Sequence, residues 1–176
     1  MNIAVNRRSL LAGTGALTVS VLLPGEKARA QVLGAATRPP LDPRNLSSYV
    51  TIKADGGAIC YWGKMDMGQG TDLGTAQMVA EELDLPIERV DIEQGDTATS
   101  VNQGGASGST GIQMGGTTLA VAAAEARHQL VQMASKQLNI PADQLRTENG
   151  AVISKADASK RVTYGQLIGG RWFDTQ

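Results

Sequence analysis

Hydrophobic and polar residues alternate one by one over residues 49–54, which predicts a half-buried β-strand where the folded part of the chain begins. Asp55-Gly56-Gly57 follows and is typical of a tight hairpin turn, because glycine adopts left-handed backbone conformations without strain. Residues 58–63 include Ile, Cys, Tyr and Trp, a composition that favours a second strand. The pattern therefore predicts a β-hairpin that begins near Ser48.

A three- and four-residue spacing of apolar side chains predicts an amphipathic helix over residues 71–83. Thr71 or Asp72 is its expected N-cap, because either side chain can accept a hydrogen bond from the first free backbone N–H groups. Pro86 ends this helix, and residues 89–93 are predicted to form a short strand. The apolar stripe of the helix consists of Leu73, Ala76, Val79, Ala80 and Leu83.

A second, longer helix is predicted over residues 117–138 and ends before Pro141. Its first half is rich in alanine, so another segment is expected to pack closely against it. Between the two helices, residues 95–116 are predicted to form a long glycine-rich loop. The elements expected after the second helix are strands over residues 145–148, 151–154 and 161–163 and a helical turn over residues 164–168.

Residues 76–95 align without a gap with residues 131–150, and the two segments share Gln, Met, Leu, Pro, Glu and Gly at matching positions. Each segment has the same order of a helix, a proline, a strand and a glycine turn. This repeat predicts an α+β domain in which two long helices and pseudo-repeated helix–Pro–strand units share one mixed sheet. The alternative is coincidence, because this order of local elements is common.

The first thirty residues have the pattern of an export signal. Arg7 and Arg8 precede an apolar run over residues 10–23, and Ala28-Arg29-Ala30 supplies a cleavage site of the small-x-small kind. The run is shorter than the roughly 20 residues that a membrane span needs. Paired arginines before a mildly apolar run predict a twin-arginine signal and a periplasmic location. An ordinary secretory signal and a cytosolic amphipathic segment are the alternatives.

Residues 31–46 contain three prolines and no periodic pattern, so they are predicted to link the signal to a domain over residues 47–176. The whole chain carries a net charge of -1 and residues 1–30 carry +3, so the remainder carries -4. This mildly acidic balance disfavours a nucleic-acid-binding protein, which would show a basic surface.

One cysteine and one histidine exclude a disulfide scaffold, a Cys-ligated iron–sulfur cluster and a His-rich metal site within this sequence. Cys60 is expected to be a small buried hydrophobe, with a reactive thiol as the alternative. His128 lies within the predicted second helix, where a surface pairing with Glu125 is expected. Ser107 and Ser109 have no His or Asp at a spacing that suggests a catalytic triad. We therefore assign no catalytic residue and no metal ligand from the residue pattern.

Two glycine-rich loops each lead into a predicted helix: a Gly-Gln-Gly segment over residues 68–70 and a longer loop over residues 104–116. Glycine lets backbone N–H groups approach a ligand closely, and a helix N-terminus adds about half a positive charge. The loops therefore predict a cradle for an anionic group such as phosphate. Neither residues 71–88 nor residues 90–126 contain Lys or Arg, so backbone dipoles would carry the binding. The alternative is that these glycines only shape turns.

Three segments together resemble the xanthine dehydrogenase/aldehyde oxidase family: K-M-D-M-G-Q-G-T, E-E-L-D-L-P-I-E-R-V-D-I-E-Q-G-D-T and Q-G-G-A-S-G-S-T-G-I-Q-M-G-G. The sequence is similar, more specifically, to the start of exported molybdenum-binding subunits of the isoquinoline 1-oxidoreductase type. Those subunits begin with a twin-arginine signal and carry the G-Q-G segment early. The resemblance covers residues 7–174 and implies part of a molybdopterin-binding domain.

The resemblance implies a site for molybdopterin in its cytosine dinucleotide form, whose dithiolene holds the molybdenum without a metal ligand from this chain. Gln69, flanked by Gly68 and Gly70, would hydrogen-bond the pterin near the metal. A second loop would wrap the cofactor with backbone amides and hydroxyls, and it comprises Ala106, Ser107, Gly108, Ser109 and Thr110.

Complete large subunits of this family also carry a glycine-rich Phe loop, an Arg near the substrate and a Gly-Glu-Pro glutamate that acts as a base. None of these occurs in this sequence, which is therefore expected to be one piece of a split subunit or a truncated reading frame. The implied partners are the remainder of the large subunit, a small [2Fe-2S] subunit and a cytochrome c. The implied reaction hydroxylates an N-heterocycle or an aldehyde with oxygen from water. The alternatives are a periplasmic interaction module, a truncated remnant without cofactor and a phosphate-ligand binder.

Overall fold

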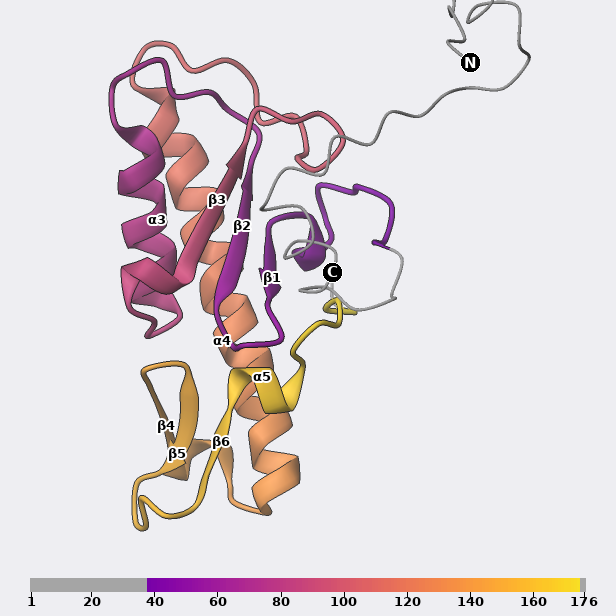
Figure 1. The fold of residues 1–176 in the computed structure, drawn as a ribbon, viewed down its shortest axis with the longest axis vertical. Coiled ribbons are helices and arrows are strands. Elements are labelled where there is room, and N and C mark those ends of the chain that lie inside the picture. Colours follow the sequence, from indigo (N-terminus) through magenta and orange to yellow (C-terminus); the bar gives the residue numbers. More distant parts are fainter. Residues whose placement is uncertain (1–37, 175–176) are drawn as a thin grey trace, which may run out of the picture.

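The computed structural model describes residues 38–174 (Figure 1). Its first sheet contains β1 (Val50–Ile52), β2 (Ala58–Trp62) and β3 (Val90–Gln94), in that order. β1 and β2 are antiparallel whereas β2 and β3 are parallel, so this sheet is mixed, as predicted. The hairpin between β1 and β2 is confirmed, and Gly56 takes the positive φ of 83° that its turn requires.

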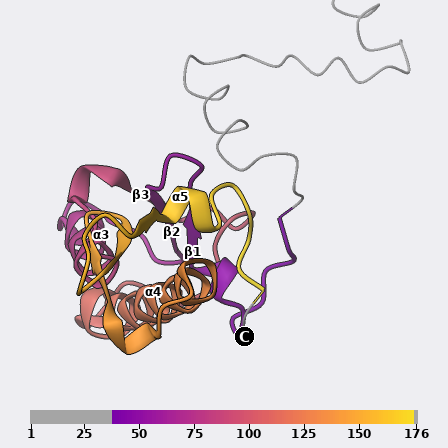
Figure 2. The same cartoon turned by 90° about the horizontal axis from the view of Figure 1, so that it is seen from below.

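Two long helices, α3 (Thr71–Glu82) and α4 (Thr117–Leu138), lie next to each other on one side of this sheet (Figure 2). The predicted bounds of α4 agree with the structure, and α3 ends one residue before its predicted end. Both helices begin at the end of the sheet where β2 and β3 finish (Figure 1). The loops that precede the two helices are therefore brought to the same end of the molecule.

The core fills the space between the helices and the first sheet. The prediction that Leu73 belongs to the buried stripe of α3 is wrong, because this side chain is 58% exposed, near the start of the helix. The other four stripe residues are buried, since they lie where α3 faces β3 and α4. The main core residues are Val50, Ile52, Cys60, Trp62, Ala76, Val79, Leu83, Leu119, Ala123, Ala126 and Leu130.

A second, antiparallel sheet lies at the far end of α4 from the glycine-rich loops (Figure 1). It contains β4 (Leu145–Glu148), β5 (Ala151–Ser154) and β6 (Arg161–Thr163), and the short helix α5 (Tyr164–Leu167) follows it. All four predicted elements are confirmed. The buried Tyr164 hydroxyl donates to Leu83 O over 2.8 Å, which ties this sheet to the end of α3.

The two predicted repeat units have the same local backbone geometry. The first helix–Pro–strand unit places Asp84 at φ 49° and the second places Asn139, its counterpart, at φ 53°. Each proline is followed by a single 3₁₀ turn, Ile87–Arg89 in the first unit and Ala142–Gln144 in the second. The strands of the two units nevertheless join different sheets, so the expectation of one shared sheet is wrong. Pairing between strands is set by long-range contacts, which local sequence similarity does not specify.

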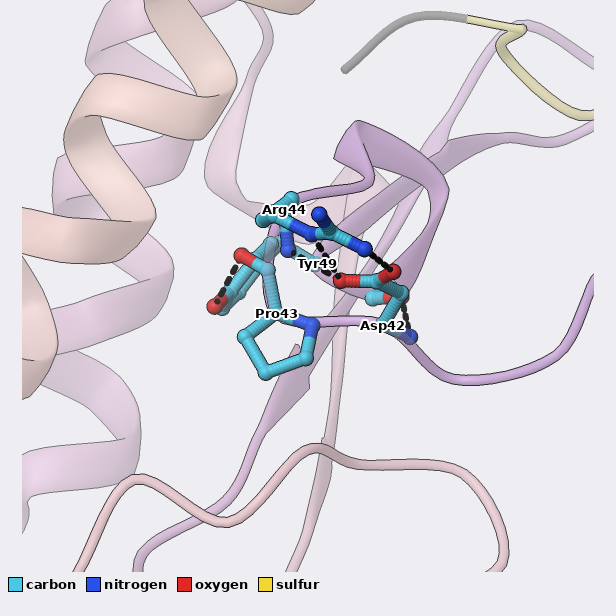
Figure 3. A network of polar contacts seen from close by, with 5 residues as sticks. Asp42, Pro43, Arg44 and Tyr49 are labelled. Carbon is cyan, nitrogen blue, oxygen red and sulfur yellow. Dashed lines mark hydrogen bonds and ion pairs between the residues drawn. The ribbon is translucent and has the colours of Figure 1, made fainter.

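Polar contacts within residues 42–49 order the segment before β1 (Figure 3). The Arg44 guanidinium donates to both carboxylate oxygens of Asp42, over 3.1 and 2.8 Å, and these bonds lower the pKa of Asp42 to about 2. The Tyr49 hydroxyl donates to Pro43 O over 3.0 Å. Asp42, Pro43 and Arg44 lie in the part of the predicted linker that the structure describes, and Tyr49 lies in the predicted domain. The predicted signal over residues 1–30 lies outside the described residues.

Cys60 is fully buried in the centre of β2, as expected for a small hydrophobe. Burial raises the pKa of its thiol well above the usual range, so the thiolate that reacts with electrophiles is not populated at neutral pH. We expect Ellman's reagent at pH 8 to leave the native chain unlabelled and to label Cys60 once guanidinium unfolds it. Fast stoichiometric labelling of the native protein would contradict the buried position.

Candidate functional site

The two glycine-rich loops meet at one end of the molecule and line a single cavity of about 420 Å³. The candidate residues Gln69 and 106–110 all line it, so residues from two separate parts of the sequence share one surface. Gly68 and Gly70 belong to the same loop as Gln69 and adopt φ values of 102° and 72°. The lining is made by Met67, Gln69, Thr71, Ala106, Ser107, Gly108, Ser109, Thr110, Gly111, Ile112 and Gln113.

The first loop is built around the carboxylate of Asp66. Oδ1 accepts hydrogen bonds from the backbone N–H groups of Gly68 and Gln69 over 2.6 and 3.0 Å. Oδ2 accepts from the Asp72 N–H over 3.1 Å and from the Thr71 hydroxyl over 3.0 Å. This carboxylate therefore occupies the anion-binding position at the N-terminus of α3.

Asp66 corrects the N-cap prediction. The residue at the N-cap position of α3 is Gly70, in a left-handed conformation, so neither Thr71 nor Asp72 is the N-cap. From inside the first turn, Asp72 Oδ1 still accepts from the Leu73 N–H over 2.6 Å. Asp66 caps α3 from four residues before the N-cap position. An N-cap residue normally accepts from N–H groups two or three residues ahead, so the sequence pattern does not indicate Asp66 as the cap. The backbone of the first loop is thus occupied by a carboxylate, so any anionic ligand must bind mainly at the second loop.

The Asp66 carboxylate should make the stability of the chain dependent on pH. Desolvation raises its pKa, but the bonds from Gly68, Asp72 and Thr71 outweigh this effect and hold the pKa well below its usual range. A depressed pKa means that the stabilisation is complete above the unfolded value of roughly 3.9 and is lost as the pH falls below it. We expect Asp66→Asn to lower Tm by a few degrees at pH 7, with the difference from the wild type shrinking below pH 4. A difference that stays constant down to pH 3 would contradict this role.

The side chain of Gln69 lies on the exposed surface of the first loop. Its Oε1 accepts from Met67 N–H over 2.7 Å, and its Nε2 lies 3.3 Å from both Met65 O and Thr71 Oγ1. The bonds made by Nε2 are at the long end of the range for hydrogen bonds. The amide N–H groups can therefore exchange these partners for an acceptor on a ligand at little cost to the loop.

The second loop presents a group of backbone donors without acceptors. Thr110 closes the loop: its hydroxyl accepts from Ser107 N–H over 3.3 Å and lies 2.9 Å from Gly105 O and 2.7 Å from Ser107 O. Gly108 takes φ 56°, and a Cβ there would meet no heavy atom within 4 Å. Among the residues that the structure describes, no acceptor is found for the N–H groups of Gly105, Ala106, Gly108 and Ser109.

These unpaired donors are what a phosphate-bearing ligand requires. Successive backbone N–H groups in a concave loop form an anion-binding site, and a helix start in the same place adds to the positive potential. Here the loop leads into Gly111–Gly116 and then into α4. The residues present therefore fit an anionic group at the second loop.

The segment Gly111–Gly116 is a turn of π-helix, which the sequence analysis placed in the loop. Its glycines allow close packing: a Cβ on Gly115 would lie 2.9 Å from the Lys64 side chain and 2.9 Å from Trp62 Nε1. Turns of π-helix occur often at functional sites, because the wider turn re-aims the backbone. Tight packing beneath this turn holds the second loop in place.

Lys64 begins the K-M-D-M-G-Q-G-T segment, but its position in the sequence indicates no role for it. It comes directly after Gly63 at the end of β2 and is only 4% exposed. Its Nζ donates to Gly105 O over 2.9 Å, so it lies beneath the second loop. Its partner lies 41 positions away, which is why the local pattern does not reveal this contact.

The other candidate places in the molecule suit an anionic ligand less well. A larger concavity of about 720 Å³ lies beside α3 and β3, and its polar lining is mostly carboxylate: Asp55, Asp72, Asp91 and Glu93 against Lys53. His128 is exposed on α4 with Nδ1 3.8 Å from Glu125, which agrees with the expected surface pairing. Within residues 38–174, no cluster of His, Cys, Asp and Glu could hold a metal ion. No helix in this range is long and apolar enough to cross a membrane.

Comparison with known proteins identifies the family of this site. Residues 29–175 match the molybdopterin cofactor-binding domain. The chain belongs to this family. The match contains both glycine-rich loops, and it confirms the resemblance to molybdopterin-binding members of the xanthine dehydrogenase family. The cofactor class expected at the cavity is therefore molybdopterin with molybdenum.

Individual relatives agree with this family. The chain is 34% identical over 167 residues to a nicotinate dehydrogenase component from Pseudomonas putida, and the match covers 94% of this chain and 14% of the relative. It is 30% identical over 173 residues to the beta chain of isoquinoline 1-oxidoreductase from Brevundimonas diminuta, covering 94% of this chain and 22% of the relative. The chain thus spans less than a quarter of the length of either relative.

Solved structures show the same fold. The CO dehydrogenase of Oligotropha carboxidovorans superimposes with a TM-score of 0.61 and 28% identity, over 67% of this chain and 15% of that one. Quinoline 2-oxidoreductase of Pseudomonas putida 86 gives a TM-score of 0.59 and 25% identity, with the same shares of the two chains. The mixed helix and sheet architecture is therefore that of molybdenum hydroxylase subunits.

Proposed function

We propose that this chain supplies the cofactor-binding part of an exported molybdenum hydroxylase and binds molybdopterin in its cytosine dinucleotide form. The observation that carries the proposal is the group of unpaired N–H donors at Gly105, Ala106, Gly108 and Ser109, in a loop that shares its cavity with Gln69. Such donors suit the pyrophosphate of a dinucleotide, which carries negative charge on several oxygens.

The residues of the cavity divide the binding between them. The N–H groups of the second loop hold the phosphate oxygens, and the Gln69 amide, which both donates and accepts, binds the polar edge of the pterin. Asp66 keeps the first loop in the shape that presents Gln69. When bound, the cofactor supplies the redox chemistry, and its dithiolene holds the molybdenum so that the chain needs no metal ligand.

The proposed reaction is the hydroxylation of an N-heterocycle or an aldehyde with oxygen from water. The names of the relatives, which include nicotinate, isoquinoline and quinoline enzymes, support an N-heterocyclic substrate. Because this sequence contains no Gly-Glu-Pro base, the complete site needs the remainder of a large subunit. Electrons then leave through a [2Fe-2S] subunit and a cytochrome c. The Arg7-Arg8 pair supports export by the twin-arginine route to the periplasm.

Metal and pterin analysis of the protein purified from its native periplasm tests this function. We expect molybdenum near one atom per complex, cytidine monophosphate released on acid hydrolysis, and a large partner chain identified by mass. Adenosine or guanosine monophosphate in its place would overturn the cytosine form only. Protein without molybdenum, pterin or partner would contradict the proposed function and favour an interaction module or a remnant.

A further inference from the structure

We propose that Lys64 is a positioning residue that fixes the Gly105–Ala106 peptide and turns the Ala106 N–H toward the phosphate-binding cavity. This inference rests on the proposed function, since the ligand that it serves is the anionic part of the cofactor. Lys64 is 4% exposed, and its Nζ donates to Gly105 O over 2.9 Å. It therefore contacts the second loop from the buried side.

Peptide geometry carries this contact to the outer side of the loop. The peptide bond is planar, and the described part of the chain contains no cis peptide bond. In a trans peptide the C=O of one residue and the N–H of the next point in opposite directions. Since Gly105 O points inward to Lys64, the Ala106 N–H points outward, and Ala106 lines the cavity. A charged donor on the carbonyl also polarises the peptide and strengthens its N–H as a donor.

The charge of Lys64 gives a second, independent argument. Within residues 38–174, Gly105 O is the one hydrogen-bonding or ion-pairing partner of Nζ. A buried ammonium without a counter-ion is unfavourable, and the cost is relieved when a negative charge arrives nearby. A phosphate at the adjacent loop supplies that charge. Lys64 thus provides the basic group that the loops themselves lack.

Packing around the stem of Lys64 fixes the direction of the side chain. A Cβ on Gly115 would lie 2.9 Å from both Cδ and Cε of Lys64, so the lysine fills the space that a larger residue at position 115 would take. Thr110 Oγ1 lies 2.9 Å from the same Gly105 O and 2.7 Å from Ser107 O, so its single proton is shared between these two carbonyls. Lys64 is therefore the stronger of the two donors that approach Gly105 O.

The test uses the full chain labelled with ¹⁵N, as wild type and as Lys64→Met. Methionine keeps the apolar stem but removes the ammonium. Lys53→Met is the matched control, because the Lys53 side chain is 13% exposed and pairs with Asp91, outside the candidate site. Without ligand, we expect Lys64→Met to shift the Ala106 amide resonance and lower its order parameter, whereas Lys53→Met leaves both unchanged. An Ala106 amide that is unchanged in Lys64→Met overturns the proposal.

Titration with inorganic pyrophosphate completes the test. We expect the wild type and Lys53→Met to shift the Ala106 resonance with the same Kd, and Lys64→Met to bind about tenfold more weakly. An equal Kd for Lys64→Met overturns the proposal. Failure of the wild type to bind pyrophosphate overturns the phosphate cradle of the proposed function, while the ligand-free spectra still decide whether Lys64 positions the peptide. If Lys64→Met does not fold, Thr110→Val removes the hydroxyl that Gly105 O shares with Ser107 O and must shift the Ala106 resonance in the same direction.

Discussion

Gly63→Ala is expected to destabilise the chain by about 3 kcal/mol or more, because overpacking against backbone cannot be relieved by a side-chain rotation. A Cβ on Gly63 would lie 1.8 Å from Val101 O and 3.1 Å from Gln103 N. The Gly63 N–H also donates to Gln103 Oε1 over 2.8 Å, so the two segments are held together as well as closely packed. Equilibrium unfolding in guanidinium measures the change in the free energy of unfolding.

Gly105→Ala is the matched control for this substitution. Gly105 lies a few residues further along the same segment, where a Cβ would meet no heavy atom within 4 Å. We expect its free energy of unfolding to stay within about 0.5 kcal/mol of the wild type. A Gly63→Ala protein with the stability of this control would show that β2 and the segment at Val101 do not pack as the structure has them.

Gly63→Ala should also weaken ligand binding, because the displaced segment leads directly into the second loop. Val101 and Gln103 precede Ala106, and Lys64 follows Gly63. A shift between the two segments therefore separates Lys64 from Gly105 O, which are now 2.9 Å apart. The close approach at Gly63 thus links the stability of the fold to the geometry of the cavity.

Elements with a clear local period could be predicted from the sequence. The bounds of α4 and of the three strands of the second sheet agree with their predictions, because alternation, helical spacing and Pro or Gly at the ends all act within a few residues. The two glycine-rich loops were found in the same way. Their meeting in one cavity was not predicted, because it depends on the parallel pairing of β2 and β3, which brings the ends of both strands to the same edge of the sheet.

Features that depend on contacts between distant segments could not be predicted. The bond between Lys64 and Gly105 joins residues 41 positions apart, and the close approach of Gly63 to Val101 has no local signature. The same reason explains the separation of the two sheets, since a repeated helix–Pro–strand unit does not specify which strand it pairs with. Asp66 is a different case. It lies close in sequence to α3, but it accepts from the Asp72 N–H six residues ahead, which is not the spacing of an ordinary N-cap.

Loss of the Gln69 amide is expected to have the largest effect on cofactor binding with the smallest effect on the fold. The side chain is exposed, and its Nε2 makes two long contacts, at 3.3 Å, with Met65 O and Thr71 Oγ1. Its Oε1 accepts one shorter bond, over 2.7 Å, from Met67 N–H, but this bond is also exposed to solvent. The removal of the amide therefore costs the fold little. The loss of the amide leaves a buried polar group of the pterin without a partner, which costs about 1–3 kcal/mol and corresponds to a roughly ten- to hundredfold change in affinity.

Two substitutions separate the contribution of the donor from that of the shape. Gln69→Ala removes the whole amide, whereas Gln69→Glu keeps an oxygen that can accept from Met67 N–H and replaces the donor with a negative charge. Because Glu has nearly the same shape as Gln and also repels phosphate, we expect Gln69→Glu to lose at least as much cofactor as Gln69→Ala. Gln77→Ala, at an exposed position on α3, is the control and should behave like the wild type.

The measurement is the molybdenum and pterin content of the assembled complex, together with Tm for each variant. We expect both Gln69 variants to contain less molybdenum and pterin than the wild type, as a ten- to hundredfold loss of cofactor affinity requires. Their Tm should stay close to that of Gln77→Ala. A Gln69→Ala complex with wild-type molybdenum content and activity would remove Gln69 from the cofactor site. A drop in Tm as large as that of Gly63→Ala would instead mean that the Gln69 amide supports the fold of the first loop. Its effect on the cofactor would then be indirect, through the shape of the cavity.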